Sequence, residues 1–173
     1  MCRKQYQKEQ DMVIDMDLLE AVYEKYKDNI FAIGFNYFRN TIEADDVVQE
    51  TFLKLARSGK DFESEEHLRN WLIRVAVNEC RRVSLSSWVK KKAPLEEYTG
   101  QIEFETREES RVFAAVMNLP KKYRQVVHLF YFEDYPTAEI ADMLGISRTA
   151  VTTRLQRSRE RLKKELMEVW EDD

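Results

Sequence analysis

The chain has 173 residues, 43% hydrophobic and 35% charged, which predicts one or two small domains with a heavily ionic surface. Only four glycines and three prolines occur, which argues against a turn-rich β architecture and excludes glycine-rich phosphate loops. The two cysteines and two histidines lack metal-ligand spacing, so we expect no metal and no cofactor. No apolar run approaches bilayer length and the N-terminus has no apolar signal region, which predicts a cytoplasmic protein without membrane insertion.

The net charge of −4 conceals a sorting of charges into blocks. Residues 81–92 and 148–164 are strongly basic, whereas residues 93–109 are strongly acidic. The binding of a polyanion depends on the local potential, because salt screens charges beyond about 8–10 Å. An acidic chain can therefore bind nucleic acid through its basic blocks, and its acidic surfaces suit a basic protein partner.

The N-terminal half is predicted to form three helices. Residues 17–40 carry apolar side chains at intervals of three and four, as one face of an amphipathic helix does. A second helix is expected over 43–57, and a third begins near Ser64, which can cap it. After an N-terminal tail (1–16), these helices make a first domain over 17–92.

The C-terminal half is predicted to form a second helical domain over 110–170. Residues 93–109 contain Pro, Gly and many Glu with little periodicity, which is typical of a linker. Helices are expected over 108–118, 121–133 and 137–144, and from Ser147 to about residue 170. The predicted fold class is all-α, with two small helical domains joined by a flexible acidic linker.

Residues 137–156 have the spacing of a helix-turn-helix. Gly145 stands where the turn needs a positive φ, Ala141 is small where the helices cross, and Ser147 can cap the second helix. The outer side of that helix, called here the recognition face, consists of Arg148, Thr149, Thr152, Thr153, Gln156 and Arg157. Arg and Gln side chains can read purines in the major groove. The alternative is a helical hairpin with a solvated basic face.

The third helix carries a polar stripe opposite its apolar side. This polar stripe consists of Arg74, Asn78, Arg81 and Arg82. The three arginines of the stripe can bind the phosphates of a nucleic-acid backbone, and the amide of Asn78 can hydrogen-bond a base edge. Trp71 and Phe62 can stack on an unpaired base, or they can belong to the core. Cys80, beside the stripe, is either a redox-sensitive thiol or a buried inert one.

The second helix presents an acidic face, formed by Asp45, Asp46, Gln49 and Glu50. Such a face is either simply solvated or the docking site of a basic protein. A catalytic carboxylate pair is disfavoured, because a partner base is missing from the pattern.

Three segments in order resemble bacterial sigma factors of the sigma-70 family, extracytoplasmic-function (ECF) subfamily. They are ADDVVQETFLKL (44–55), WLIRVAVNECRR (71–82) and residues 119–162. The resemblance covers roughly 17–92 and 108–167, and it implies sigma region 2 and region 4 without region 3. It implies a non-catalytic subunit that binds core RNA polymerase, directs promoter-specific initiation and is released afterwards.

The resemblance also implies site residues. Those matching the helix that docks on the β′ coiled coil are Asp45, Asp46, Val48, Gln49, Glu50 and Phe52. Those matching minus-ten contacts are Phe62, Ser64, His67, Trp71, Arg74, Asn78, Arg81 and Arg82. The recognition face matches the positions that read the minus-thirty-five element. The chain departs from some relatives at Glu65 and Glu66, which bring two acids close to the expected DNA.

The partners implied are core polymerase, through its β′ coiled coil and β flap, promoter DNA and an anti-sigma factor, with the free protein a monomer. One alternative is a free-standing helix-turn-helix regulator that binds a two-fold symmetric operator as a dimer. Another is an inactive decoy that only occupies polymerase. An enzyme is the least favoured class, since the sequence offers no nucleophile–base pair, metal set or phosphate loop.

Overall fold

The amphipathic segments of the N-terminal half form three helices, which we call the N-terminal unit. The computed structural model describes residues 12–13, 16–85 and 106–171 of the chain. The helices are α1 (Met16–Phe38), α2 (Thr41–Ser58) and α3 (Glu65–Leu85). Their apolar sides meet in a core that fully buries Ile30 of α1, Leu55 of α2 and Leu72 of α3. The three predicted helices are confirmed, because burial of one apolar face stabilises each of them.

A close crossing joins α1 to α2. Asn40 caps α2 by accepting a hydrogen bond from the Glu43 backbone N–H at 3.1 Å. Gly34 of α1 lies against Ala44 of α2, where an added Cβ would come within 2.9 Å of the Ala44 Cα. A larger residue at position 34 would therefore push the two helices apart.

Two short strands accompany the N-terminal unit. Strand β1 (Met12–Val13) pairs antiparallel with β2 (Asp61–Phe62), and Met12 lies opposite Phe62. Two-residue strands leave no periodic signal, so the sequence pattern leaves 12–13 in the predicted tail and 61–62 between two predicted helices. The all-α fold class is confirmed, because the remaining described elements are helices.

The C-terminal half forms a C-terminal unit of four helices. They are α5 (Arg107–Asn118), α6 (Lys121–Tyr131), α7 (Thr137–Leu144) and α8 (Arg148–Glu171). Gly145 ends α7 at φ 64°, and Ser147 accepts a hydrogen bond from the Ala150 N–H at 3.1 Å. Val151 and Leu155 of α8 are buried beneath this turn. The predicted helix-turn-helix is confirmed, with its glycine and serine in the expected roles.

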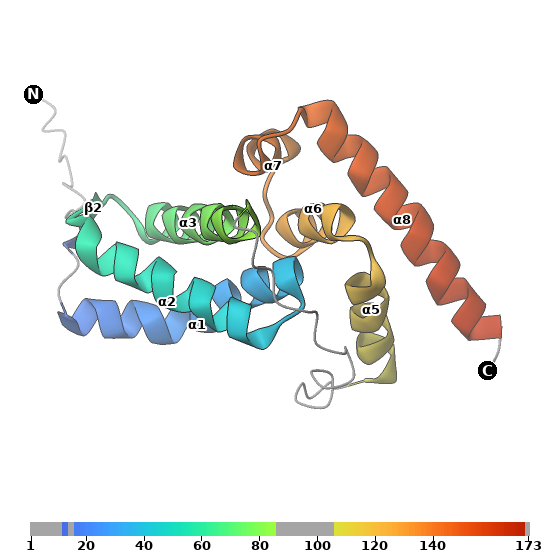
Figure 1. Cartoon of the computed structure of the whole chain (residues 1–173), viewed down its shortest axis with the longest axis horizontal. Helices are drawn as coiled ribbons and strands as arrows, with labels where there is room; N and C mark the ends of the chain where they lie inside the picture. The colour runs from blue at the N-terminus through green and yellow to red at the C-terminus, as the bar shows by residue number, and fades with distance from the viewer. Residues whose placement is uncertain (1–11, 14–15, 86–105, 172–173) are drawn as a thin grey trace, which may run out of the picture.

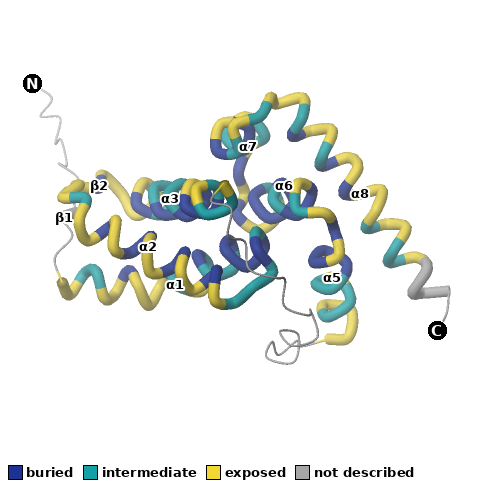
Figure 2. The backbone as a smooth tube through the Cα atoms, in the orientation of Figure 1, coloured by how far each residue is buried: buried dark blue, intermediate teal, exposed yellow. Residues whose placement is uncertain are grey.

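The two units pack directly against each other. One apolar cluster contains Ile33 of α1 and Val77 of α3 together with Val126 and Leu129 of α6 and Ile140 of α7. Figure 1 shows α6 and α7 beside α1 and α3, with α8 on the outer side. Residues coloured as buried gather where these helices face one another (Figure 2). Most of the predicted linker, residues 93–105, lies outside the described part of the chain, and residues 107–109 already belong to α5.

None of the described helices is both long and apolar enough to cross a membrane.

Candidate functional site

The acidic face of α2 lies open to solvent. All four of its side chains are exposed, as predicted. Val48 and Phe52, assigned to the same docking helix, instead point into the core and are only 6% and 7% exposed. Their position follows from the helical period, which places them on the apolar stripe with Leu55. They support the α2 helix from within, and of the six assigned residues only the four acidic-face side chains are open to solvent.

A buried carboxylate ties α2 to α3. Glu79 is 2% exposed and accepts hydrogen bonds from Lys54 and from Arg82 Nε, the latter at 2.8 Å. Burial disfavours the charged form, but the two cationic donors outweigh it and lower the pKa of Glu79. Arg82 stays exposed while it makes this bond. The ion pairs therefore hold one member of the polar stripe at the surface.

The segment before α3 is packed rather than open. Phe62 is fully buried and lies edge-on to His67 and Trp71, with ring centroids 5.4 and 5.7 Å apart. In this structure Phe62 therefore belongs to the core and offers no face to a base. Ser64 caps α3 by accepting from the His67 backbone N–H at 3.1 Å, and the His67 side chain is exposed. Trp71 is half-buried beneath Lys60, whose Nζ lies 5.7 Å from the Trp71 ring centroid.

The polar stripe of α3 is divided in this structure. Arg74 Nη2 pairs with Glu139 Oε2 of α7 at 2.9 Å, and Arg81 Nη1 donates to the Met143 carbonyl at 3.0 Å. Asn78, between them on the stripe, is exposed. Helix α7 packs across the two arginines, so the polar stripe is not a continuous free face in this structure.

Cys80 lies within the core beside the stripe. Its side chain is fully buried, and burial raises the pKa of its thiol. Thiols react as thiolates at accessible sites, so this arrangement is that of an inert thiol.

The recognition face of α8 is open along its whole length. All six of its side chains are exposed. Thr152 Oγ1 donates to the Thr149 carbonyl at 2.9 Å, and Gln156 Nε2 donates to Glu160 Oε1 at 3.1 Å. Arg148 Nε also donates to Thr137 Oγ1 of α7 at 3.2 Å, and the six side chains nevertheless stay exposed to a large partner.

A basic hollow adjoins the recognition face. It has a volume of about 280 Å³, and Lys122, Tyr123, Thr149, Thr153 and Arg157 are among its lining residues. The Arg157 guanidinium beside the Tyr123 hydroxyl lowers the pKa of that tyrosine. Cations gathered around hydroxyl groups favour a phosphate oxygen. Within the described residues, no three His, Cys, Asp or Glu side chains come together as a metal site.

Comparison with known proteins identifies the family. The model of sigma-70 region 2 matches residues 22–90, and that of sigma-70 region 4 matches residues 110–162. The ECF RNA polymerase sigma factor SigW of Bacillus subtilis is 27% identical over 177 residues, covering 90% of this chain and 92% of SigW. The chain belongs to the sigma-70 family, in its ECF subfamily. It is thus a non-catalytic specificity subunit that directs RNA polymerase to promoters for transcription initiation.

Solved structures have the same fold. The sigma factor RpoE of Bartonella quintana, in complex with the anti-sigma factor NepR, superposes with a TM-score of 0.61 at 19% identity, covering 86% of this chain and 96% of RpoE. CnrH, in complex with the cytosolic domain of CnrY, superposes with a TM-score of 0.57 at 23% identity, covering 88% and 89% of the two chains. The region 2 match falls on the N-terminal unit and the region 4 match on the C-terminal unit.

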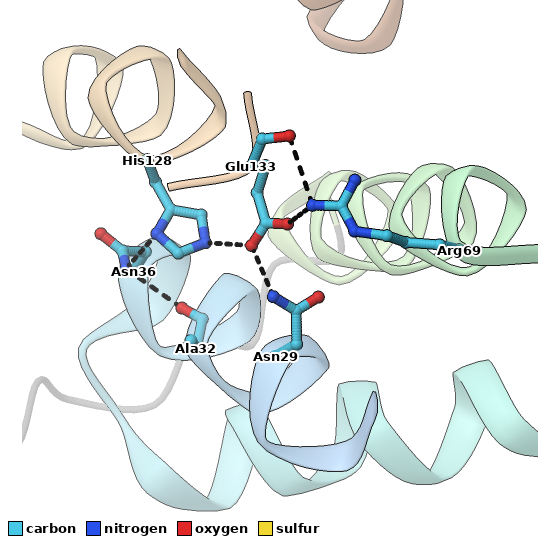
Figure 3. Close-up of polar contacts among 6 residues, drawn as sticks. All are labelled: Asn29, Ala32, Asn36, Arg69, His128 and Glu133. Atoms are coloured by element: carbon cyan, nitrogen blue, oxygen red, sulfur yellow. Dashed lines mark hydrogen bonds and ion pairs between the residues drawn. The ribbon is translucent and has the colours of Figure 1, made fainter. Parts of the chain in front are cut away.

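In this sigma factor a buried polar network joins the two units, as Figure 3 shows. The Glu133 carboxylate accepts from Asn29 of α1 at 2.8 Å and from Arg69 of α3 at 2.9 Å. His128 Nε2 of α6 lies 3.2 Å from the same carboxylate. Asn36 Nδ2 lies 3.0 Å from His128 Nδ1. We call these five residues the Glu133 network.

The network orients the ring of His128. An amide nitrogen can only donate, so Nδ1 of His128 accepts from Asn36, whereas its Nε2 lies 3.2 Å from the Glu133 carboxylate without making a hydrogen bond. Sequence patterns do not reveal this network, because its members are separated by up to 104 residues along the chain. The available signal was a polar residue, His128, on the apolar side of a predicted helix.

Proposed function

We propose that this sigma factor reads the minus-thirty-five element with α8 and the minus-ten element with α3, after α2 has docked on core RNA polymerase. The recognition face carries the proposal: six exposed side chains able to hydrogen-bond lie on the second helix of a helix-turn-helix. A helix in that position enters the major groove, where arginine and amide side chains distinguish bases. The basic hollow beside it suits a backbone phosphate of the same site.

Polymerase docking is proposed for the acidic face of α2. Its four exposed side chains project from a helix that α1 and α3 support from behind. Charged surfaces of this kind attract a partner of opposite sign and set the orientation of the complex. Basic groups on the β′ coiled coil of the largest polymerase subunit would be the matching surface, with the C-terminal unit on the β flap.

Minus-ten recognition is proposed for the polar stripe and the start of α3. Asn78, Arg82 and His67 are exposed, and Trp71 is half-buried at the same helix. In this proposal the arginines hold the strand backbone, while Asn78 bonds an unpaired base and Trp71 stacks on it. Ser64 acts through the α3 cap, and Phe62 acts by supporting Trp71 from the core.

An anti-sigma factor is proposed as the inhibitory partner. The RpoE structure contains such a factor, and its sigma chain shares the fold described above. The chain would be a monomer when free and would leave polymerase after initiation. A free-standing dimeric regulator would instead bind a two-fold symmetric operator tightly without polymerase.

Run-off transcription tests the proposal. Purified protein and bacterial core polymerase are incubated with a promoter library from the source genome, and core alone is the control. Transcripts that share paired upstream elements and require the protein are expected. Absence of such transcripts, from a core that is active with another sigma factor, would contradict the proposal.

A further inference from the structure

Helix α7 covers part of the polar stripe, the α3 surface proposed above to bind minus-ten DNA. The Arg74–Glu139 pair is half-exposed, with 43% and 41% of the two side chains accessible. Arg81 is held by the Met143 carbonyl and also lies against Gly145, where an added Cβ would meet its Nη2 at 2.8 Å. Two of the three arginines of the polar stripe are thus occupied by the protein's own C-terminal unit.

The Glu133 network holds α7 in that place. Glu133 lies in the turn between α6 and α7, and its side chain is 1% exposed. A carboxylate buried to this degree requires charged or hydrogen-bonding partners, and it finds them in Asn29 and Arg69 of the N-terminal unit. Moving the C-terminal unit away would break the bonds of Glu133 to Asn29 and Arg69. The same movement would separate Arg74 and Arg81 from α7.

Other contacts between the units are polar as well. Tyr135 donates to Asn70 Oδ1 at 2.6 Å, and Lys121 Nζ donates to Ser84 Oγ at 2.8 Å. Such groups can bond water once separated, so polar interfaces between units part at lower cost than apolar ones. The interface therefore combines an apolar centre and the buried Glu133 network, which favour closure, with part-buried polar pairs that water can replace on opening.

We propose that the Glu133 network is an intramolecular latch that keeps the C-terminal unit closed over Arg74 and Arg81, so that the polar stripe binds DNA only after the latch opens. The proposal rests on the proposed minus-ten role of the stripe. The chain would then exist in a closed and an open state, of which only the open state binds DNA through the stripe. The apparent DNA affinity equals the affinity of the open state multiplied by the fraction of molecules that are open.

The conformational part is tested by small-angle X-ray scattering on the full chain. A compact chain of this length has a radius of gyration of about 16 Å. Glu133→Gln keeps the side-chain shape but removes the charge that pairs with Arg69. We expect it to increase the radius of gyration, while Asp142→Asn, an exposed acid on α7, leaves it unchanged. Circular dichroism verifies that each variant retains its helix content.

The masking part is tested by fluorescence anisotropy with a random-sequence single-stranded DNA oligonucleotide. We expect Glu133→Gln to bind it about tenfold more tightly than Asp142→Asn, which has the same net charge. Adding Arg74→Gln and Arg81→Gln to the latch variant should remove the gain. Should Glu133→Gln fail to fold, Glu139→Gln releases Arg74 from a half-exposed pair and gives a smaller gain in the same assay.

Each outcome separates the latch from the proposed function. An unchanged radius of gyration in folded Glu133→Gln would overturn the latch. A larger radius without a gain in affinity would overturn the masking of DNA-binding arginines. A gain in both, with run-off transcription absent for the wild type and the variant, would support the latch and contradict the role as a promoter-reading factor.

Discussion

Arg124 of α6 donates its Nε–H to the backbone carbonyl of Asn36 in α1 at 2.7 Å, so a buried guanidinium bonds the backbone of the other unit. Its Nη1 donates to the Leu119 carbonyl at 2.7 Å and to the Met117 carbonyl at 3.2 Å. Burial is the main cause of the lowered pKa of Arg124, with the nearby charge of Arg39 adding to it. One side chain therefore binds the end of α5, the start of α6 and the end of α1 together.

Arg124→Met should destabilise the fold by about 3 kcal/mol, because three carbonyls lose a charged donor in a buried place. Urea unfolding followed by circular dichroism measures the change in the free energy of unfolding. Lys163→Met, at an exposed position of α8, is the control and should have little effect. Equal stability of the two variants would show that water replaces the lost bonds.

Asp46→Arg should weaken binding to core polymerase by about tenfold or more and leave the fold intact, since this acid is exposed on α2. The affinity is measured by fluorescence titration of labelled protein with core enzyme. Asp28→Arg, the same charge reversal on an exposed position of α1, is the matched control. Unchanged affinity of the Asp46 variant would reject the acidic face as the docking surface.

Arg157→Ala should cost about 1–3 kcal/mol of minus-thirty-five binding if its guanidinium contacts a base. The measurement is the affinity for a set of duplexes that differ at single positions of the element. Lys163→Ala, farther along α8, is the control. A loss that is equal on every duplex would instead assign Arg157 to a phosphate in the basic hollow.

Gly145→Ala should destabilise the protein by about 1–3 kcal/mol, because its φ of 64° strains a residue with a Cβ and that Cβ meets Arg81 Nη2 at 2.8 Å. Gly59→Ala has a similar φ of 56° and no atom within 4 Å, so it reports the backbone strain alone. Thermal unfolding measures the stability of both variants, and the difference between them gives the cost of displacing Arg81. We expect Gly145→Ala to be the less stable of the two.

Alkaline pH should lower the free energy of unfolding, because the buried Tyr135 then ionises. Burial is the main cause of its pKa being raised to about 12, whereas in the unfolded chain the group titrates near its ordinary value of 10. The stability that this tyrosine contributes is therefore fully present below about pH 10 and is lost as the pH rises toward 12. Urea unfolding across this range measures the loss. Tyr135→Phe lacks the titrating group and should show a shallower dependence on pH.

Local sequence was sufficient for the helices and for the helix-turn-helix. Periodic apolar residues predict a helix because each buries a face, and the caps at Ser64 and Ser147 act within one turn. The sequence predicts Gly145 as the turn residue, because a positive φ is a property of its own backbone and favours glycine. The exposed acids of α2 and the recognition face of α8 followed from the same helical period, and the roles assigned to them remain predictions.

Long-range packing decided the rest. The core position of Phe62 depends on contacts with α3, and the division of the polar stripe depends on α7 lying across it. Glu133 is paired with Asn29 over 104 residues of sequence, and no periodicity or spacing records such a contact. Local patterns report how a segment folds, whereas the tertiary structure determines which of its faces a distant segment covers.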